Sequence, residues 1–194
     1  MKKLLEFNPN LYDPLFAELL QEERLNSLGP GTPNTKIRPA LAALTIEKAL
    51  APNQIIDTGM ARACFAGIWL YHDFLEESHQ ISQSIATTTG SYWHGIMHRR
   101  EPDFSNSKYW FHRVGEHPIF ASLQEAAAEL AAANIAHEST EFLRQQKKWD
   151  PFAFIDHCEA CVNRRSPAEM LCRQIQLGEW KLLFDYCYHQ AVGK

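Results

Sequence analysis

Apolar residues recur at the spacing of an α-helix along most of the chain, and no segment alternates polar and apolar residues as a half-buried β-strand does. One such stripe comprises Cys64, Phe65, Ile68, Tyr71 and Leu75. Residues at these spacings fall on one side of a helix, and that side has to be buried against other helices. The pattern therefore predicts an all-α fold: an irregular bundle of seven to nine helices in a single domain that spans residues 1–194.

Prolines, glycines and capping residues divide the chain into helical segments. The predicted helices cover approximately residues 14–24, 39–50, 59–79, 90–101, 106–114, 119–136, 138–148, 151–163 and 167–191. The threonines at 87–89 offer an N-cap to the central helix, Asp103 or Ser105 caps the next one, and Gly115 ends it. Long loops are expected near residues 26–39 and 80–90. The first is either a functional loop or a simple connector.

Composition narrows the classes of function. The chain is 45% hydrophobic and 22% charged, as folded proteins are, and its net charge of −4 comes without a basic tract, which argues against nucleic-acid binding. Polar residues interrupt the N-terminus too early for a signal peptide, and no apolar run has transmembrane length. Five cysteines without a secretion signal indicate reduced thiols, so we expect a cytoplasmic protein that contacts neither nucleic acid nor membrane. No nucleotide-cofactor motif is recognisable.

Residues 90–118 concentrate the polar chemistry of the sequence. Four of the nine histidines fall in this stretch, together with arginines, carboxylates and tryptophans. A helix that only fills a core needs few of these residue types, whereas a site for a polar ligand needs many. The stretch is therefore the predicted location of the functional site.

Two predicted helices carry similar polar triads at positions i, i+4 and i+7. The first triad is His72, Glu76 and His79, and the second is His94, His98 and Glu101. If the helices pack antiparallel, imidazoles and carboxylates converge, as a Zn²⁺, Fe²⁺ or Mn²⁺ site requires. The predicted metal ligands are Glu76, His79, His94 and His98. The alternative is that these histidines are hydrogen-bonded core residues.

Cationic residues next to the second triad predict an anion site. Its predicted substrate-binding residues are Arg99, Arg100, Asn106, Lys108 and Tyr109, with Arg113 nearby. Arginine side chains bind carboxylate or phosphate through two parallel hydrogen bonds. The alternative is a set of surface ion pairs in which the arginines contact Glu101 or Asp103. For catalysis, the predicted groups are Glu101 as a base or metal ligand and His98 as a proton relay or metal ligand.

The segment Cys158-x-x-Cys161, with His157 beside it, is the other motif-like feature. A structural zinc site needs two ligands beyond the two cysteines. Cys172, Cys187 and His189 are available, but not at a diagnostic spacing. On a helix, Cys158 and Cys161 share a face, so packing as small core residues is the alternative interpretation.

The central stretch also resembles a family signature. It reads Tyr-Trp-His-Gly-Ile-Met-His-Arg-Arg-Glu-Pro-Asp-Phe over residues 92–104, followed by Asn106, Lys108-Tyr109-Trp110, Val114-Gly115 and His117-Pro118. With Ser-His-Gln-Ile-Ser-Gln at 78–83 and Leu-Gly-Pro-Gly at 28–31, it is similar to a family of uncharacterised bacterial and fungal proteins. The resemblance covers roughly the middle half of the chain. It implies a shared site built on His79, His94, His98, Arg99, Arg100, Asn106 and Lys108, and it implies no particular activity.

These features lead to three hypotheses of function. The first is a metal-assisted enzyme that acts on a small anionic metabolite, phosphorylated or carboxylated, in a pocket lined by histidine and arginine. The second is a non-catalytic protein that binds a small anion or has a regulatory role. The third is a structural or partner-binding helical domain whose histidines belong to the core.

Overall fold

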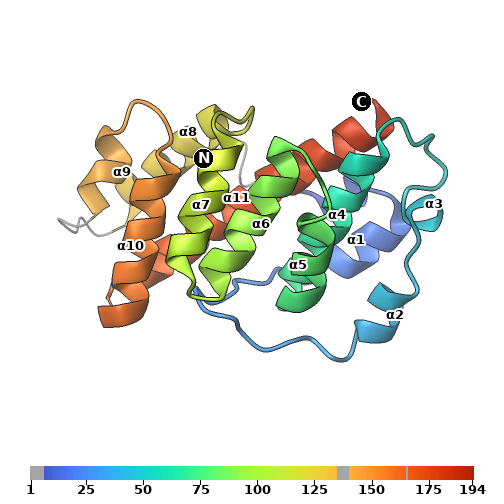
Figure 1. Ribbon diagram of the computed structural model, residues 1–194, viewed down its shortest axis with the longest axis horizontal. Helices are drawn as coiled ribbons and strands as arrows, with labels where there is room; N and C mark the ends of the chain where they lie inside the picture. Colours follow the sequence, from blue (N-terminus) through green and yellow to red (C-terminus); the bar gives the residue numbers. More distant parts are fainter. Residues whose placement is uncertain (1–6, 135–139, 165) are drawn as a thin grey trace.

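The computed structural model describes residues 7–134, 140–164 and 166–194, and helices with their connecting loops make up these parts of the chain (Figure 1). The helices are α1 (Pro14–Leu20), α2 (Arg38–Ala42), α3 (Ile46–Ala49), α4 (Thr58–Tyr71), α5 (Leu75–Ser82), α6 (Thr88–Arg100), α7 (Phe104–Val114), α8 (Phe120–Ala133), α9 (Glu141–Gln145), α10 (Pro151–Arg164) and α11 (Glu169–Val192). The predicted all-α class is confirmed. Within the described residues there are eleven α-helices, because two of the predicted segments are broken.

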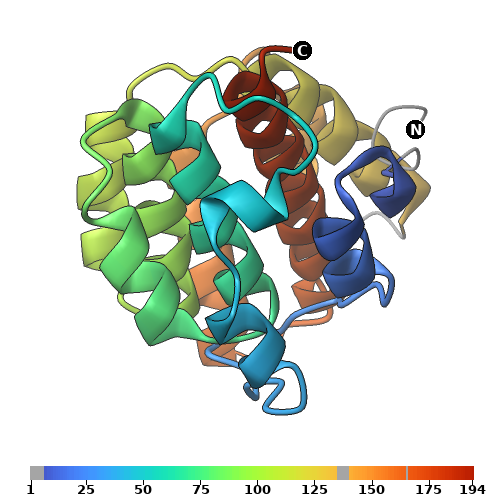
Figure 2. The ribbon, with the colours of Figure 1, turned by 90° about the vertical axis from the view of Figure 1, so that its right-hand side faces the viewer.

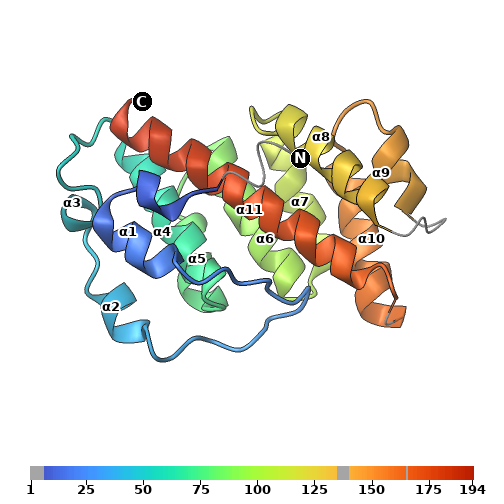
Figure 3. The ribbon, with the colours of Figure 1, turned by 180° about the vertical axis from the view of Figure 1, so that it is seen from behind.

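Helix α6 occupies the centre of the bundle. It packs against α4, α5 and α7, while α11 packs against α4, α8 and α10. Seen from behind, α11 runs diagonally across the molecule and joins its two ends (Figure 3). Seen from the side, α11 stands between α1 and the group formed by α4 to α7 (Figure 2). On the α1 side, Phe16 meets Phe184 of α11 edge to face, with 5.4 Å between the ring centroids.

One continuous hydrophobic core joins these helices. Every residue of α6 from Thr89 to Arg100 is buried, including the large rings of Tyr92 and Trp93. Burial of one such side chain contributes about 1.5–3 kcal/mol to folding. A fully buried helix has no solvent-facing side on which to place polar residues. Each polar side chain of α6 therefore needs a partner inside the protein.

Two glycines allow the neighbours of α6 to approach closely. A Cβ atom on Gly67 of α4 would lie 2.8 Å from the Trp93 ring, and one on Gly95 of α6 would lie 2.8 Å from the Phe111 ring of α7. These distances are shorter than van der Waals contact. Glycine at these two positions therefore sets the spacing of α4, α6 and α7.

The helix predicted over residues 59–79 is in fact two helices. Helix α4 ends at Tyr71, and Asp73 adopts a left-handed backbone conformation with φ of 64°. Aspartate tolerates this conformation better than most residues, and the side chain of Asp73 is fixed by three donors described below. Helix α5 starts in a new direction at Leu75 (Figure 1). The predicted continuous stripe through His72, Glu76 and His79 was wrong for this reason.

Other predicted boundaries agree more closely. Thr87 caps α6 by accepting a hydrogen bond from Gly90 N at 3.1 Å. Asp103 caps α7 in the same way, by accepting from Asn106 N at 3.1 Å. Helix α7 is followed by Gly115, whose φ is 62°. The segment predicted over 39–50 splits into α2 and α3, because Thr45 caps a new helix. Part of the helix predicted over 138–148 lies outside the described residues, and α9 covers its middle.

The loop predicted over residues 26–39 is present, and it is tethered. It runs along one edge of the bundle between α1 and α2 (Figures 1 and 3). Arg100 donates to Gly29 O at 2.7 Å, and Gln176 of α11 donates to Ser27 O at 3.1 Å. Side chains from α6 and α11 thus hold the loop against the core. Throughout the part of the chain that the structure describes, each helix is too short or too polar to cross a bilayer.

Candidate metal centre

Three histidines converge where α5 packs against α6. His79 comes from α5, and His94 and His98 lie one turn apart on α6. Each offers a ring nitrogen, and the three nitrogens lie within 4.8 Å of one another. The ring centroids are 4.6 Å apart for His79 and His94, 4.7 Å for His94 and His98, and 5.4 Å for His79 and His98. His94 and His98 are buried and His79 is half-buried, so the cluster lies just below the surface.

Hydrogen bonds fix the orientation of two of these rings. Ser82 Oγ donates to the His79 carbonyl at 3.2 Å and therefore accepts from His94 Nδ1 at 3.0 Å. Glu101 Oε2 lies 3.1 Å from His98 Nδ1 and accepts its proton. With Nδ1 protonated in both rings, the lone pair is on Nε2. Metal-binding histidines commonly show this arrangement, in which an oxygen acceptor holds the nitrogen that does not bind the ion.

Burial keeps His94 and His98 uncharged. Burial, followed by the neighbouring His98 and His79 rings, lowers the pKa of His94 to about 3. The pKa of His98 is also lowered, first by burial, although Glu101 acts in the opposite direction. Both imidazoles are therefore neutral at neutral pH. Neutral imidazole is the form that binds metal ions, so a cation would enter without displacing ring protons.

Helix α7 closes one side of the cluster. The Trp110 ring lies 4.1 Å from the His94 ring between centroids, and the Arg113 guanidinium lies 5.2 Å from the Trp110 centroid. Asn106 Nδ2 is 3.1 Å from His98 Nε2. The carboxylate of Glu101 stands at the exposed edge, with 39% of its side chain accessible. Glu101 is thus the solvent-accessible polar group beside His98.

One predicted metal ligand, Glu76, and one member of the predicted triads, His72, lie apart from the three histidines. Glu76 is exposed, accepts from Gln80 Nε2 at 2.8 Å, and is not part of the three-histidine group. The break at Asp73 turns His72 toward α1, where its Nε2 contacts Leu19 O at 2.9 Å. Residues before and after a change of helix direction cannot share a face. The helix break therefore separates His72 from His79, whereas Glu76 shares α5 with His79 but lies on the exposed side of that helix.

The predicted cationic pocket is also dispersed. Arg99 forms an ion pair with Glu179 of α11, with 1% and 0% of the two side chains exposed, and Lys108 pairs with Asp156 of α10. Tyr109 is 54% exposed and points away from the bundle core. Of the predicted substrate-binding residues, only Asn106 lies at the histidines. The physical reason is that a guanidinium buried on a central helix requires a buried carboxylate of its own.

Arg100 anchors the loop rather than a substrate. Its Nη2 donates to Asp73 Oδ1 at 2.6 Å and its Nε donates to Gly29 O. Asp73 also accepts from Arg24 at 3.1 Å and from Asn26 at 2.8 Å. Two guanidiniums and an amide thus surround one buried carboxylate, and together they hold the loop between α1 and α2.

Three partners were missed at the sequence level: Ser82, Asp73 and Glu179. Ser82 lies one turn after His79 on α5, so a helical reading could have paired it with the site. Glu179 lies on the same face of α11 as Ile175 and Leu183, and a carboxylate on an apolar stripe signals a buried partner. Asp73 gave no comparable signal, because its position depends on the break in the helix.

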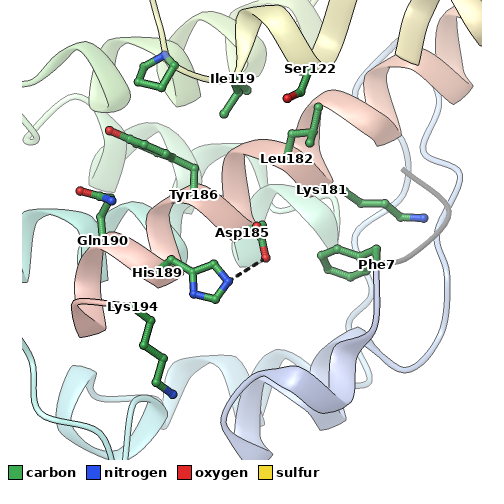
Figure 4. A pocket seen from close by; sticks show the side chains of 11 residues that line it. Phe7, Ile119, Ser122, Lys181, Leu182, Asp185, Tyr186, His189, Gln190 and Lys194 are labelled. Atoms are coloured by element: carbon green, nitrogen blue, oxygen red, sulfur yellow. Dashed lines mark ion pairs between the residues drawn. The ribbon is translucent and has the colours of Figure 1, made fainter. Parts of the chain in front are cut away.

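A separate pocket of about 500 Å³ lies on the far side of α11, between α11, Phe7 and the start of α8 (Figure 4). His189 and Asp185 form an ion pair of 3.3 Å at its floor, and Lys181 and Lys194 lie at its rim. None of the predicted site residues lines this pocket. We place more weight on the histidine cluster, because its side chains converge and are held in one orientation.

The chain matches no protein-family model, no curated protein sequence and no solved structure. The case for function therefore rests on the side chains themselves. Their arrangement is that of three converging imidazoles beside a carboxylate near the surface.

Proposed function

We propose that the protein is a metal-assisted enzyme whose ion is held by His79, His94 and His98. The observation that carries this proposal is the convergence of three ring nitrogens within 4.8 Å. Three imidazoles suit Zn²⁺ best, with Fe²⁺ or Mn²⁺ as alternatives. Tetrahedral coordination at Zn–N distances of 2.0–2.1 Å places ligand nitrogens about 3.3 Å apart. Small side-chain rotations on two packed helices would close the remaining gap.

Three protein ligands leave one coordination position open, which is typical of catalytic metal sites. A metal ion held here would polarise a water molecule or a substrate oxygen. In this proposal the arginines do not bind the anion, because they form ion pairs within the fold. The bound cation would attract the anionic group instead. The substrate class that we propose remains a small metabolite with a phosphate or carboxylate group.

The residues of the chain have separate roles in this proposal. Glu101 orients His98 through Oε2 and, from its exposed edge, takes a proton from the attacking water as general base. Asn106 is placed to donate a hydrogen bond to bound substrate, because its amide already lies beside His98. Ser82 accepts from His94 Nδ1 and so leaves the lone pair of His94 on Nε2, where it could bind the ion.

Metal analysis of the untagged protein tests the proposal. We expect the wild-type protein to hold an ion that the double variant His94→Ala/His98→Ala lacks. The variant His112→Ala is the matched control, since His112 is exposed on α7 and packs on Phe152 with centroids 4.4 Å apart. Equal metal content in all three proteins, each folded by circular dichroism, would disprove the site. If the wild-type protein retains bound metal, small phosphate and carboxylate esters should be screened as substrates, with Glu101→Gln as the inactive control.

A second candidate function is supported by the pocket of Figure 4. Lys181, Lys194 and His189 line this pocket together with apolar side chains and with Asp185, and these cationic groups suit a small organic anion bound without catalysis. Thermal stabilisation by small phosphates or carboxylates that is lost in Lys194→Ala and kept in His94→Ala/His98→Ala would favour this second function.

A further inference from the structure

A second group of potential ligands lies between α10 and α11. His157 and Cys161 of α10 and Cys172 of α11 place their ligand atoms within 4.8 Å of one another. All three side chains are buried, and both cysteines are fully inaccessible to solvent. The Cys-x-x-Cys motif of α10 contains only part of this group, because Cys172 belongs to the next helix.

The distance between the two sulfur atoms is informative. Cys161 Sγ and Cys172 Sγ are 3.7 Å apart. Two thiolates on one tetrahedral Zn²⁺, each at about 2.3 Å from the ion, lie about 3.8 Å apart. The pair therefore already has the separation that shared coordination requires.

Cys158 supplies a fourth potential ligand. It lies three residues before Cys161, so these two cysteines share a face of α10. The Cys158 thiol, and after it that of Cys161, raises the pKa of Cys172. Three sulfurs and one imidazole form a common donor set of structural zinc sites.

The surroundings of Arg99 give an independent argument. This guanidinium is 1% exposed and donates through Nη2 to Glu179, but among the described residues its Nε and Nη1 have no hydrogen-bond partner. Cys158 is one of the groups that act electrostatically on Arg99. Unpaired N–H donors in a protein interior are costly. Thiolates bound to a metal would give these donors acceptors, as outer hydrogen bonds to ligand sulfur do in other metal sites.

We propose that His157, Cys158, Cys161 and Cys172 form a structural Zn²⁺ site that joins α10 to α11. The site is independent of the histidine cluster, because it shares no residue with it. Its role would be to stabilise the end of the bundle, where α10 and α11 meet. All four ligands are buried, so no position is open to a substrate.

Cobalt substitution of the full chain tests this proposal without requiring a variant to fold. Protein purified with reductant, stripped of metal and loaded with Co²⁺ should show a thiolate-to-cobalt charge-transfer band in the near ultraviolet. The band should persist in His94→Ala/His98→Ala and disappear in Cys161→Ser/Cys172→Ser. The matched control is Cys64→Ser/Cys187→Ser, which changes two buried cysteines outside the group and should keep the band.

Zinc analysis completes the test. We expect one equivalent that Cys161→Ser/Cys172→Ser loses and the His94→Ala/His98→Ala variant keeps, so failure here is distinguishable from failure of the histidine site. Absence of the charge-transfer band in the loaded wild-type protein would overturn the proposal. So would a Cys161–Cys172 disulfide in protein alkylated on isolation, since that result would indicate a dithiol pair instead of a metal site.

Discussion

Replacement of Arg99 distinguishes an anion-binding arginine from a structural one. The Arg99–Glu179 pair joins the central helix α6 to α11, with essentially no exposure of either side chain. Glu179 has a second donor, since Tyr92 OH donates to its Oε1 at 3.0 Å. In the variant Arg99→Met, Glu179 would stay buried with its charge unpaired, and only the tyrosine would remain as a partner.

The expected magnitude follows from that geometry. Removal of one partner of a fully buried ion pair costs about 3–5 kcal/mol, because the other charge loses compensation without regaining water. Glu179→Gln should cost a similar amount, since it leaves Arg99 uncompensated while Tyr92 keeps an acceptor. The double variant Arg99→Met/Glu179→Gln buries no charge at this position. We therefore expect the double variant to lose less free energy of unfolding than the sum of the two single variants, by about 2 kcal/mol or more.

Denaturant unfolding at neutral pH, at one fixed metal concentration, measures these free energies. The control is Arg38→Met, because Arg38 pairs with Glu77 at 2.6 Å but is 55% exposed, and exposed pairs contribute about 0–1 kcal/mol. If Arg99→Met costs as little as Arg38→Met and also abolishes stabilisation by phosphate, the structural role argued here is refuted. An anion-binding role for Arg99 would then be restored.

Three further predictions concern pH, the loop and the metal site. Burial lowers the pKa of His72 and His117 from 6.5 to about 4, and it is the main cause that lowers the pKa of His94 to about 3. The unfolded chain therefore binds more protons below pH 6.5, and each histidine should lower the stability of metal-free protein by up to about 1.4 kcal/mol per pH unit as pH falls toward 4. Gly31→Ala places a Cβ 2.6 Å from Asp73 Oδ1 at a φ of +73°, and should cost about 1–3 kcal/mol and expose residues 25–37 to protease. Ser82→Ala removes the acceptor of His94 Nδ1 and should weaken metal binding about 10–100-fold by competition with a chelator.

Each of these predictions has its own control. An acid titration in which stability stays flat from pH 6.5 to 4 would contradict the buried neutral histidines. Gly29→Ala should be nearly neutral, because a Cβ there meets no atom within 4 Å, and equal effects of the two glycine variants would refute the close contact with Asp73. Ser84→Ala changes an exposed serine near the end of α5, and should leave metal affinity unchanged.

The helix class and several boundaries were predictable because their causes are local. Thr87 and Asp103 cap helices through their own side chains, and Gly115 ends one through its backbone conformation. Such signals are contained within a few residues of sequence. The break after Tyr71 was not predictable in this way. It depends on Asp73, which is fixed by Arg24, Asn26 and Arg100 from distant parts of the chain.

The candidate site was predictable in part for the same reason. His94 and His98 share a face because they are one turn apart, and α5 brings His79 to them across a short loop. The structural role of Arg99 depends on its ion pair with Glu179, which is 80 residues away along the chain. Residue types indicated that cations were present, but only tertiary packing determined which of them were already neutralised within the fold.

The placement of the three histidines on two very different helices has a kinetic consequence. His94 and His98 are carried by α6, which is buried along almost its whole length, while His79 is carried by α5, a short helix with an exposed side. Amide hydrogen exchange should therefore be slowest in α6 and faster in α5. An ion held by all three would escape during brief openings of α5 alone. Its dissociation rate would then be independent of the global unfolding rate, and the folded protein could exchange one metal for another.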